Sequence, residues 1–433
     1  MKKQPFIFIV SLILFYSAIQ HYVIPMLDNS SRTDFYLVWA VEKHHSLSGK
    51  KLGNIYPEET RIQIAREIKE LALNLKDLRL FHDSIARQDL NLCATPFFFS
   101  VFRFFNSGFY TEDLDRFSWF SLVCFSGAFF LGSFVFSIPL SYGILFCSLC
   151  LIFYRPLISS LSLGNVNEIL LFSIISLFYM EKRFQKPAAS LLSGLGLSLL
   201  CFLKPLFVFS WALWFLGKCI FSSYRKAFYF AAGSLLGALG ALIMTHQMFD
   251  VIAAWKGWLN YMLTLDLTYW SRFISFGNFS LSAGMYEWLH MKPVLMHYLC
   301  CLGLGTGCLI YLKKAKGHQD LAFSEQTGLF WLGQAFFILT SPLFWAHYFT
   351  LALIPLFQLF CLNGTEKISG ILYRISLFLL VWFSVGDRTL WENIPDLSPV
   401  AMTLSISLPV LLLYGSVTVM LISPNESASD LSD

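Results

Sequence analysis

Asp34 is the first residue of the chain with a clear capacity for chemistry. It follows the first long apolar segment, at about 5–25, and lies within 31–36 (SRTDFY). A carboxylate at the mouth of membrane spans is unfavourable unless it faces water or a partner, and there it can accept a proton from an incoming hydroxyl. The alternative is structural, because Asp is a favoured N-cap and a helix could begin at Phe35. Asp28, nearer the span, is a weaker candidate of the same kind.

Lys204 is a second charged candidate. The pair Lys204-Pro205 joins two apolar segments at an expected exterior turn, where a lysine runs against the bias that keeps Lys and Arg cytoplasmic. We therefore expect an anionic partner for it, and a phosphate on a lipid carrier would suit. The alternative is a lysine that extends toward lipid headgroups.

Two amides open one of the later spans. Segment 164–168 (GNVNE) contains Asn165 and Asn167, and polar groups at that depth face the interior of a helix bundle. They can bind a sugar, or they can only hold helices together.

An aromatic cluster interrupts another span. Segment 341–348 (SPLFWAHY) contains Trp345, His347 and Tyr348, which offer a stacking surface and hydrogen-bond donors suited to a sugar or a phosphate. A packed histidine with a structural hydrogen bond is the alternative.

The expected second exterior loop, 247–290, is rich in Trp and Tyr and contains Arg272 and Asn278. Both are candidate substrate-binding residues, although aromatic residues there can simply mark the membrane interface. Asp113 and Asp115 have the spacing of a nucleotide-sugar metal motif but lie in a short polar turn. The pair Cys147 and Cys150 has a metal-ligand spacing but lies within an apolar span, so the sequence indicates no metal and no cofactor.

Membrane spans must position these residues. The chain has 433 residues, of which 56% are hydrophobic and 13% charged, about half the charged fraction of a soluble protein. Apolar stretches of about twenty residues recur, each long enough to cross a hydrocarbon core of about 30 Å. The sequence therefore predicts an all-α, polytopic protein of the cell inner membrane, with one integral domain over 1–433. Its net charge of +4 comes from short clusters between spans and implies no nucleic-acid partner.

Basic clusters set the expected orientation. Lys2 and Lys3 place the N-terminus in the cytoplasm, so 27–91 forms the first exterior loop, and the polar tail 423–433 ends inside. About twelve crossings are expected. The apolar segments lie near 5–25, 92–106, 117–136, 138–155, 166–180, 187–203, 206–221, 227–246, 293–312, 325–341, 345–362, 369–385 and 398–422. One of the four segments between 92 and 180 cannot cross, because the loop before them and the basic cluster after them lie on opposite sides.

Within the first exterior loop, Glu58 to Leu80 has the pattern of one amphipathic helix. Its apolar face would carry Ile64, Ile68, Leu71, Leu75 and Leu78. Such a helix either lies in the membrane interface or packs on the bundle as part of a small subdomain.

Taken in order, these motifs resemble those of glycosyltransferase family 87, polytopic transferases of the GT-C fold that use polyprenyl-phosphate sugars. The stretch 34–36 (DFY), with Gly49 and 54–57 (NIYP), resembles the family's opening Asp-aromatic stretch, and 95–97 (TPF) the start of its second span. Further matches are 164–167 (GNVN) to Gly-Gln-x-Asn, 204–205 to Lys-Pro, 278–280 (NFS) to Asn-x-Ser, and 341–348 to Ser-Pro-x-x-Trp-x-His-His.

The resemblance implies a GT-C-type bundle that moves one sugar, with mannose expected, from a polyprenyl-phosphate donor to a lipid or glycan acceptor. Transfer would occur at the exterior (periplasmic) membrane face with inversion. The resemblance assigns Asp34 the role of catalytic base and places Lys204 and His347 near the donor phosphate.

Several positions depart from the family pattern. Ala346 stands where the family often has Asp, and Tyr348 replaces its second His. Cys93 and Ala94 stand where aromatic residues are usual. These differences leave the sugar and the acceptor open.

Two other functions compete with this one. An O-antigen ligase or polymerase would depend on exterior arginines such as Arg272. A lipid or solute transporter would carry charged residues in mid-bilayer, whereas the polar candidates here gather at one face.

Overall fold

The structure is a computed structural model that describes residues 4–29, 32–90, 93–184, 187–265, 280–283, 286, 301, 303–310, 312–313, 323–341, 343, 345–361, 410–415 and 418. Within these ranges the regular elements are helices, and the one pairing between extended segments is an isolated bridge from Leu52 to Phe249. The expectation of an all-α chain is confirmed. Further spans are expected at 293–312, 369–385 and 398–422. Half of the first segment and most of 398–422 lie outside the described residues, as does all of 369–385.

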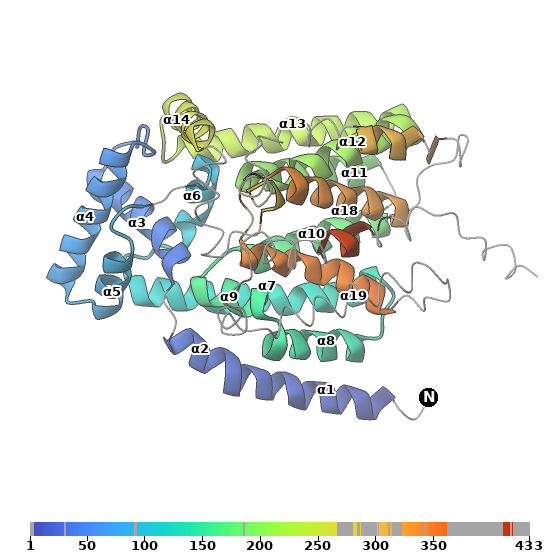
Figure 1. Cartoon of the computed structure of the whole chain (residues 1–433), viewed down its shortest axis with the longest axis horizontal. Helices are drawn as coiled ribbons and strands as arrows, with labels where there is room; N and C mark the ends of the chain where they lie inside the picture. Colours follow the sequence, from blue (N-terminus) through green and yellow to red (C-terminus); the bar gives the residue numbers. More distant parts are fainter. Residues whose placement is uncertain are drawn as a thin grey trace, which may run out of the picture.

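The first span is one nearly continuous helix at the edge of the bundle. It consists of α1 (Gln4–Ala18), a π-helical turn η1 (Ile19–Val23) and α2 (Ile24–Asn29). The stretch Pro5–Asp28 is 24 residues long and apolar, which is enough to cross a membrane. It packs on α8 (Leu140–Phe153), as Figure 1 shows.

Two further helices, α7 (Tyr110–Val135) and α13 (Tyr224–His246), have the length and hydropathy of a span. The helix α8 and the following α9 (Arg155–Leu163) form a candidate broken span, bent by 72°. The described part of the chain thus holds three single helices and one bent pair that could cross a membrane. This supports the prediction of a membrane protein.

The remaining helices of the bundle are shorter and run beside these spans (Figure 1). They are α10 (Asn167–Phe184), α11 (Pro187–Leu203), η3 (Pro205–Phe207), α12 (Val208–Phe221), α18 (Phe323–Thr340), the 3-10 helix η5 (Ala346–Ala352) and α19 (Leu353–Cys361). Contacts between α10 and α7, α11 and α13, and α12 and α18 join them into one packed body.

The segment expected near 92–106 forms only a short helix, α6 (Pro96–Phe102), followed by the 3-10 turn η2 (Arg103–Phe105). The helix begins where Thr95 accepts a hydrogen bond from the backbone N–H of Phe98 and proline occupies the first turn. Together α6 and η2 extend about 15 Å, half the thickness of a hydrocarbon core. By length, α6 and η2 cannot cross a membrane by themselves.

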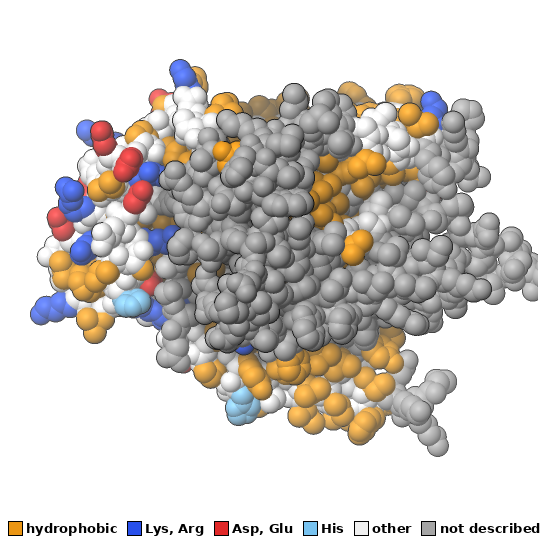
Figure 2. Space-filling view, viewed as in Figure 1, with side chains coloured by type: hydrophobic (Ala, Val, Ile, Leu, Met, Phe, Trp, Pro, Cys, Tyr) orange, Lys and Arg blue, Asp and Glu red, His pale blue; other side chains and the backbone are white. Residues whose placement is uncertain are grey.

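Three helices of the expected first exterior loop (27–91) and one of the expected second (247–290) lie at one end of the bundle (Figure 1). They are α3 (Thr33–Ser48), α4 (Glu58–Leu75), α5 (Leu78–Ala86) and α14 (Val251–Thr264). Figure 2 shows Lys, Arg, Asp and Glu side chains gathered over this end, whereas the visible side chains of α1 and α8 are largely hydrophobic.

The prediction of a single amphipathic helix over Glu58 to Leu80 is wrong at the C-terminal end of that range. The helix α4 stops at Lys76, which has a left-handed backbone (φ 54°). Asp77 then caps α5 by accepting hydrogen bonds from the backbone N–H groups of Arg79 and Leu80. A favourable N-cap inside the apolar pattern therefore splits it into two helices.

Because of this break, the five apolar residues expected on one helix face do not all face the same way. Ile64 and Ile68 are fully buried where α4 packs on α3 and α5, but Leu75 and Leu78 are 55% and 83% exposed. Of the two alternatives for this region, the packing favours a subdomain seated on the bundle.

The two exterior loops are joined directly. The backbone N–H of Leu52 donates to the carbonyl of Met248 (2.9 Å), and the N–H of Asp250 donates to the carbonyl of Leu52 (2.8 Å). Arg61, which is buried on α4, donates to the hydroxyl of Tyr261 on α14 (2.7 Å). The first loop is thus fastened to the start of the second.

Close packing of α11 on α13 depends on glycine. A Cβ built on Gly233 would lie 1.9 Å from the backbone oxygen of Leu191, and one on Gly194 would lie 2.1 Å from that of Phe230. Gly240, on the same helix as Gly233, has open space around it. Small residues that let helix backbones approach are a common basis of helix association in membranes.

We expect Gly233→Ala to destabilise the protein by about 1–3 kcal/mol, because the methyl group meets backbone that cannot move away locally. The matched substitution Gly240→Ala should change little. The measurement is the temperature at which the purified protein in detergent loses its monodisperse elution peak. Equal transition temperatures for the two variants would contradict the packing argument.

Candidate functional site

A cavity of about 870 Å³ lies between α3, α6 and α14 and the adjoining ends of the bundle helices. Its size falls within the range of small-molecule sites, about 300–1,000 Å³. Apolar side chains such as Phe98, Met262 and Phe337 form much of the wall. The polar and aromatic groups that line it include Asp34, Arg87, Asn165, Lys204, Trp345, His347 and Tyr348.

Asp34 lies in the first turn of α3, not at its N-cap. The N-cap is Arg32, without a capping side-chain hydrogen bond, and the helix begins at Thr33. The structural alternative, in which Asp34 caps a helix from Phe35, is therefore wrong. A carboxylate in the first turn is favoured by the helix dipole, and that of Asp34 faces the cavity, where Oδ2 accepts a 2.7 Å hydrogen bond from Nδ2 of Asn165.

Hydrogen bonds from Arg32 fix the start of α3. Its buried guanidinium donates to the hydroxyl of Ser118 on α7 and to the carbonyl of Leu27 (2.8 Å) at the end of the first span. Asp34 is therefore fixed relative to two long helices.

Asn165 reaches Asp34 because Gly164 ends α9 in a left-handed conformation (φ 66°). A Cβ on Gly164 would also lie 2.9 Å from Cβ of Phe35. Both the backbone angle and the close approach of α3 require glycine here.

The side-chain orientation of Asn165 follows from its partners. Its Oδ1 accepts from Nζ of Lys204 (3.1 Å) and from the backbone N–H of Val166 (2.8 Å). Lysine offers only donors, so the amide nitrogen must face the other way, toward Asp34 and toward Nε2 of His347 (3.2 Å). Asn165 thus links the acid, the lysine and the histidine.

His347 accepts this hydrogen bond through Nε2. An imidazole that accepts at Nε2 is neutral and carries its proton on Nδ1. The ring is 7% exposed and meets the ring of Tyr348 edge-on, with 4.8 Å between centroids. In this state His347 offers the cavity a neutral ring rather than a second positive charge.

Lys204 lies in the turn between α11 and η3, outside both apolar helices. Its ammonium donates to Oδ1 of Asn165 and Oδ1 of Asn167, both at 3.1 Å, and lies 4.6 Å from the ring centroid of Tyr348. Among the described residues, no carboxylate lies within 4.0 Å of Nζ. The groups that Nζ contacts directly are therefore neutral, and the charge is available to an anion.

Burial lowers the pKa of Lys204 to about 8, although the nearby carboxylates of Asp34 and Glu168 act to raise it. The ammonium form persists below this pKa and is lost as pH rises through it.

Asn167 lies beneath the cavity and not on its surface. It is fully buried and donates to the backbone carbonyl of His347 (2.9 Å) and the hydroxyl of Ser160 (3.3 Å). Expected as a substrate-binding residue, it instead fixes η5 and Lys204 in place. Of its two sequence-based alternatives, the one that holds helices together describes it.

The other expected residues divide into two groups. Trp345 and Tyr348 line the cavity. Arg272 and Asn278 lie outside the described residues. Asp113 and Asp115 do not act as a pair, because Asp113 is fully buried and accepts hydrogen bonds from Trp39 and Ser107, whereas Asp115 is at the surface near Arg79.

Arg87 is the cavity residue that sequence reasoning missed. It follows α5, and its Nη2 lies 3.6 Å from Oδ1 of Asp34. Since α5 was not expected as a separate helix, nothing in the sequence distinguished Arg87 from the other basic residues of the loop. Among the described residues that line the cavity, Arg87 and Lys204 are the two cations and Asp34 is the one carboxylate.

In comparisons with family models, with curated proteins and with solved structures, the chain matches none of them.

Proposed function

We propose that the protein is an inverting glycosyltransferase of the GT-C type with about twelve spans. It transfers a sugar, with mannose as the expected one, from a polyprenyl phosphate to a lipid or glycan acceptor. The reaction takes place at the exterior (periplasmic) face of the inner membrane. The observation that carries this proposal is that Asp34 and Lys204 share one cavity and contact opposite ends of the same amide, that of Asn165.

This arrangement suits a single displacement at a sugar carbon. The acceptor hydroxyl gives its proton to Asp34 while its oxygen bonds to the anomeric carbon. The bond from that carbon to the phosphate oxygen breaks, and polyprenyl phosphate leaves with one more negative charge. Lys204 offsets the new charge from a fixed position. The leaving group is already a phosphate, so the step balances without a nucleotide.

Asn165 supports both roles. The N–H group of Asn165 binds Oδ2 of Asp34, so the proton goes to Oδ1, which Nη2 of Arg87 approaches to 3.6 Å. The amide oxygen of Asn165 aligns the ammonium of Lys204. The apolar wall from Phe98, Met262 and Phe337 suits a prenyl chain.

The direct test uses proteoliposomes that contain the purified protein and polyprenyl-phosphate mannose. We expect release of polyprenyl phosphate and an inverted anomeric configuration in the product. Absence of release with mannose but release with another polyprenyl-phosphate sugar would change the sugar only. Absence of release with every monophosphate donor offered, in the presence of a lipid acceptor mixture, would contradict the proposal.

Lys204 predicts a pH dependence. Because its pKa is lowered to about 8, the free enzyme loses the ammonium as pH rises past that value. We expect kcat/KM to fall above about pH 8, tenfold for each further unit while one deprotonation controls the rate. A Lys204→Arg variant stays charged over this range, so its residual activity should not fall there.

Arg87 separates the glycosyltransferase from the ligase alternative, since it is an exterior arginine in the cavity. We expect Arg87→Ala to lower kcat/KM by about tenfold, the usual size of one charge-assisted contact. The exposed Arg116 on α7 provides a matched control, and Arg116→Ala should leave the rate unchanged. Complete loss of activity in Arg87→Ala, with full activity in Asp34→Asn, would favour the ligase or polymerase.

A further inference from the structure

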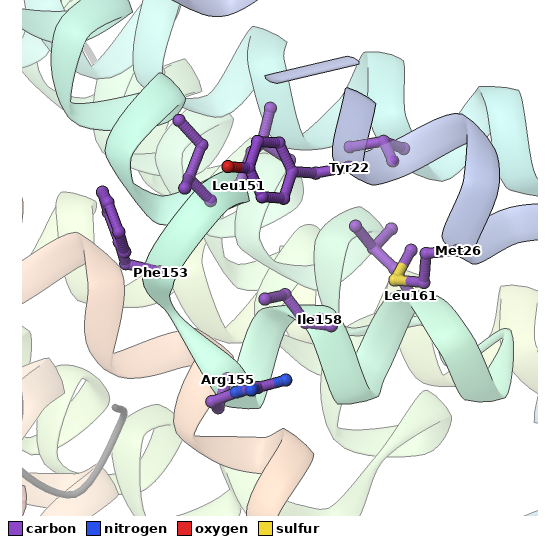
Figure 3. Close-up of a pocket in the computed structure, with 9 residues that line it drawn as sticks. Tyr22, Met26, Leu151, Phe153, Arg155, Ile158 and Leu161 are labelled. Atoms are coloured by element: carbon purple, nitrogen blue, oxygen red, sulfur yellow. The ribbon is translucent and has the colours of Figure 1, made fainter. Parts of the chain in front are cut away.

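A second cavity, of about 380 Å³, lies on the side of the bundle, between the first span and the bent pair α8–α9. We call it the side groove. Tyr22 and Met26 reach into it from the first span, and Leu151, Ile158 and Leu161 face them from α8 and α9 (Figure 3). Among the described residues that line it, Arg155 is the one charged residue.

Arg155 is exposed at the start of α9, beside Ile158 (Figure 3). Among the described residues, no carboxylate lies within ion-pair distance of it, and none of the hydrogen bonds found there involves its guanidinium. A cation within an apolar surface at membrane depth marks a place where an anion can be bound.

The length of α8 indicates how deep Arg155 lies in the membrane. The end of α8 at Leu140 adjoins the turn where Lys182 contacts Ser137 and the carbonyl of Val135, part of the basic cluster that closes α10. The 14 residues of α8 extend about 21 Å from there. In a core of about 30 Å, Arg155 then lies in the half nearer the large cavity. Its long side chain can extend from that depth toward the level of the lipid phosphates.

The groove exists because the chain bends by 72° between α8 and α9. Tyr154 stabilises the bend, since its hydroxyl donates to the carbonyl of Phe349 in η5 (2.9 Å). The bend leaves apolar side chains on one side and a guanidinium at the edge. This combination matches a lipid that carries a phosphate next to a hydrocarbon chain.

We propose that the side groove binds an anionic phospholipid, with the phosphate on Arg155 and the first part of one acyl chain against Tyr22, Ile158 and Leu161. A volume of about 380 Å³ holds only this part of the molecule, so the remaining hydrocarbon lies in the bilayer. A free phosphate ion fits less well, because the apolar walls offer it nothing.

The side groove is separate from the large cavity, since none of the described residues lines both. Helix α9 nevertheless lies between them: Ile158 and Leu161 face the groove, whereas Ser159 and Leu163 face the large cavity. A phospholipid in the groove therefore supports the helix that leads into Gly164 and Asn165. The proposal itself does not depend on the reaction in that cavity.

The test measures lipid binding rather than activity. The purified protein in neutral detergent is titrated with phosphatidylglycerol or phosphatidylcholine, and bound lipid is counted by native mass spectrometry alongside thermal stability. We expect wild type to retain one phosphatidylglycerol in preference to phosphatidylcholine. Arg155→Gln should lower the phosphatidylglycerol affinity at least tenfold. Arg183→Gln, which removes an exposed arginine from the opposite end of the bundle, should bind as wild type does.

A second variant guards against misfolding of the first. Ile158→Trp fills the groove and leaves the guanidinium intact, and we expect it to lose the same lipid. Retention of phosphatidylglycerol at wild-type affinity by both variants would overturn the proposal. Equal stabilisation of wild type by inorganic phosphate would overturn it as well, because the site would then recognise an ion rather than a lipid.

Discussion

Replacement of Asp34 by Asn is expected to lower kcat for sugar transfer by a factor of about 10²–10⁴, the range that a positioned general base contributes. The variant keeps the size of the side chain and an oxygen that can accept from Asn165, so the fold should persist. It cannot take the acceptor proton. Single-turnover transfer from polyprenyl-phosphate mannose in proteoliposomes measures the effect.

The control for Asp34 is Asp115→Asn, which changes an exposed carboxylate at the same end of the molecule. It should retain the wild-type rate. Donor binding is the second readout: because Asp34 acts on the acceptor, Asp34→Asn should bind the donor as tightly as wild type does. A well-folded Asp34→Asn protein with normal turnover would remove the carboxylate from the mechanism.

Loss of the charge at Lys204 should have the next largest effect. We expect Lys204→Gln to lower kcat by about 10²–10³, the size seen when one fixed group that stabilises developing charge is removed. Affinity for the product polyprenyl phosphate should also fall, since the same ammonium binds it in the ground state. A substitution with a purely structural effect would lower the amount of folded protein and leave product affinity per folded molecule unchanged.

Lys182→Gln is the matched control for this substitution. Lys182 contacts the turn at Val135 and Ser137, away from the cavity, and its charge also lies at a helix end. We expect full turnover from it. Product inhibition that is identical in wild type and Lys204→Gln would show that the lysine does not meet the phosphate.

The motifs that converge in the structure come from four places in the chain. Asp34, Asn165, Lys204 and His347 were each selected from the sequence because a polar side chain is conspicuous at the end of an apolar span. The sequence could not give their mutual contacts, because these depend on the left-handed turn at Gly164 and on the close approach of Phe35. Nor could it separate Asn165, which faces the cavity, from Asn167, which lies beneath it.

The helices were predictable to different degrees for physical reasons. Long apolar stretches such as α7 and α13 follow from hydropathy alone. The first exterior loop does not, because one capping residue, Asp77, outweighs the amphipathic pattern across it. Arg87 lies in the cavity because it follows α5, the extra helix that this cap begins. Hydropathy also could not tell that 92–106 would end after a few turns.

The backbone hydrogen bonds that link Leu52 to Met248 and Asp250 determine how the two loops can move. A loop that opens as a hinged lid needs one free edge. Here the first loop is hydrogen-bonded to the second at residue 52, so that edge is not free. The described parts of the two loops therefore form one connected unit at this end of the bundle. A deletion next to this bridge in either loop should therefore loosen the start of the other loop as well.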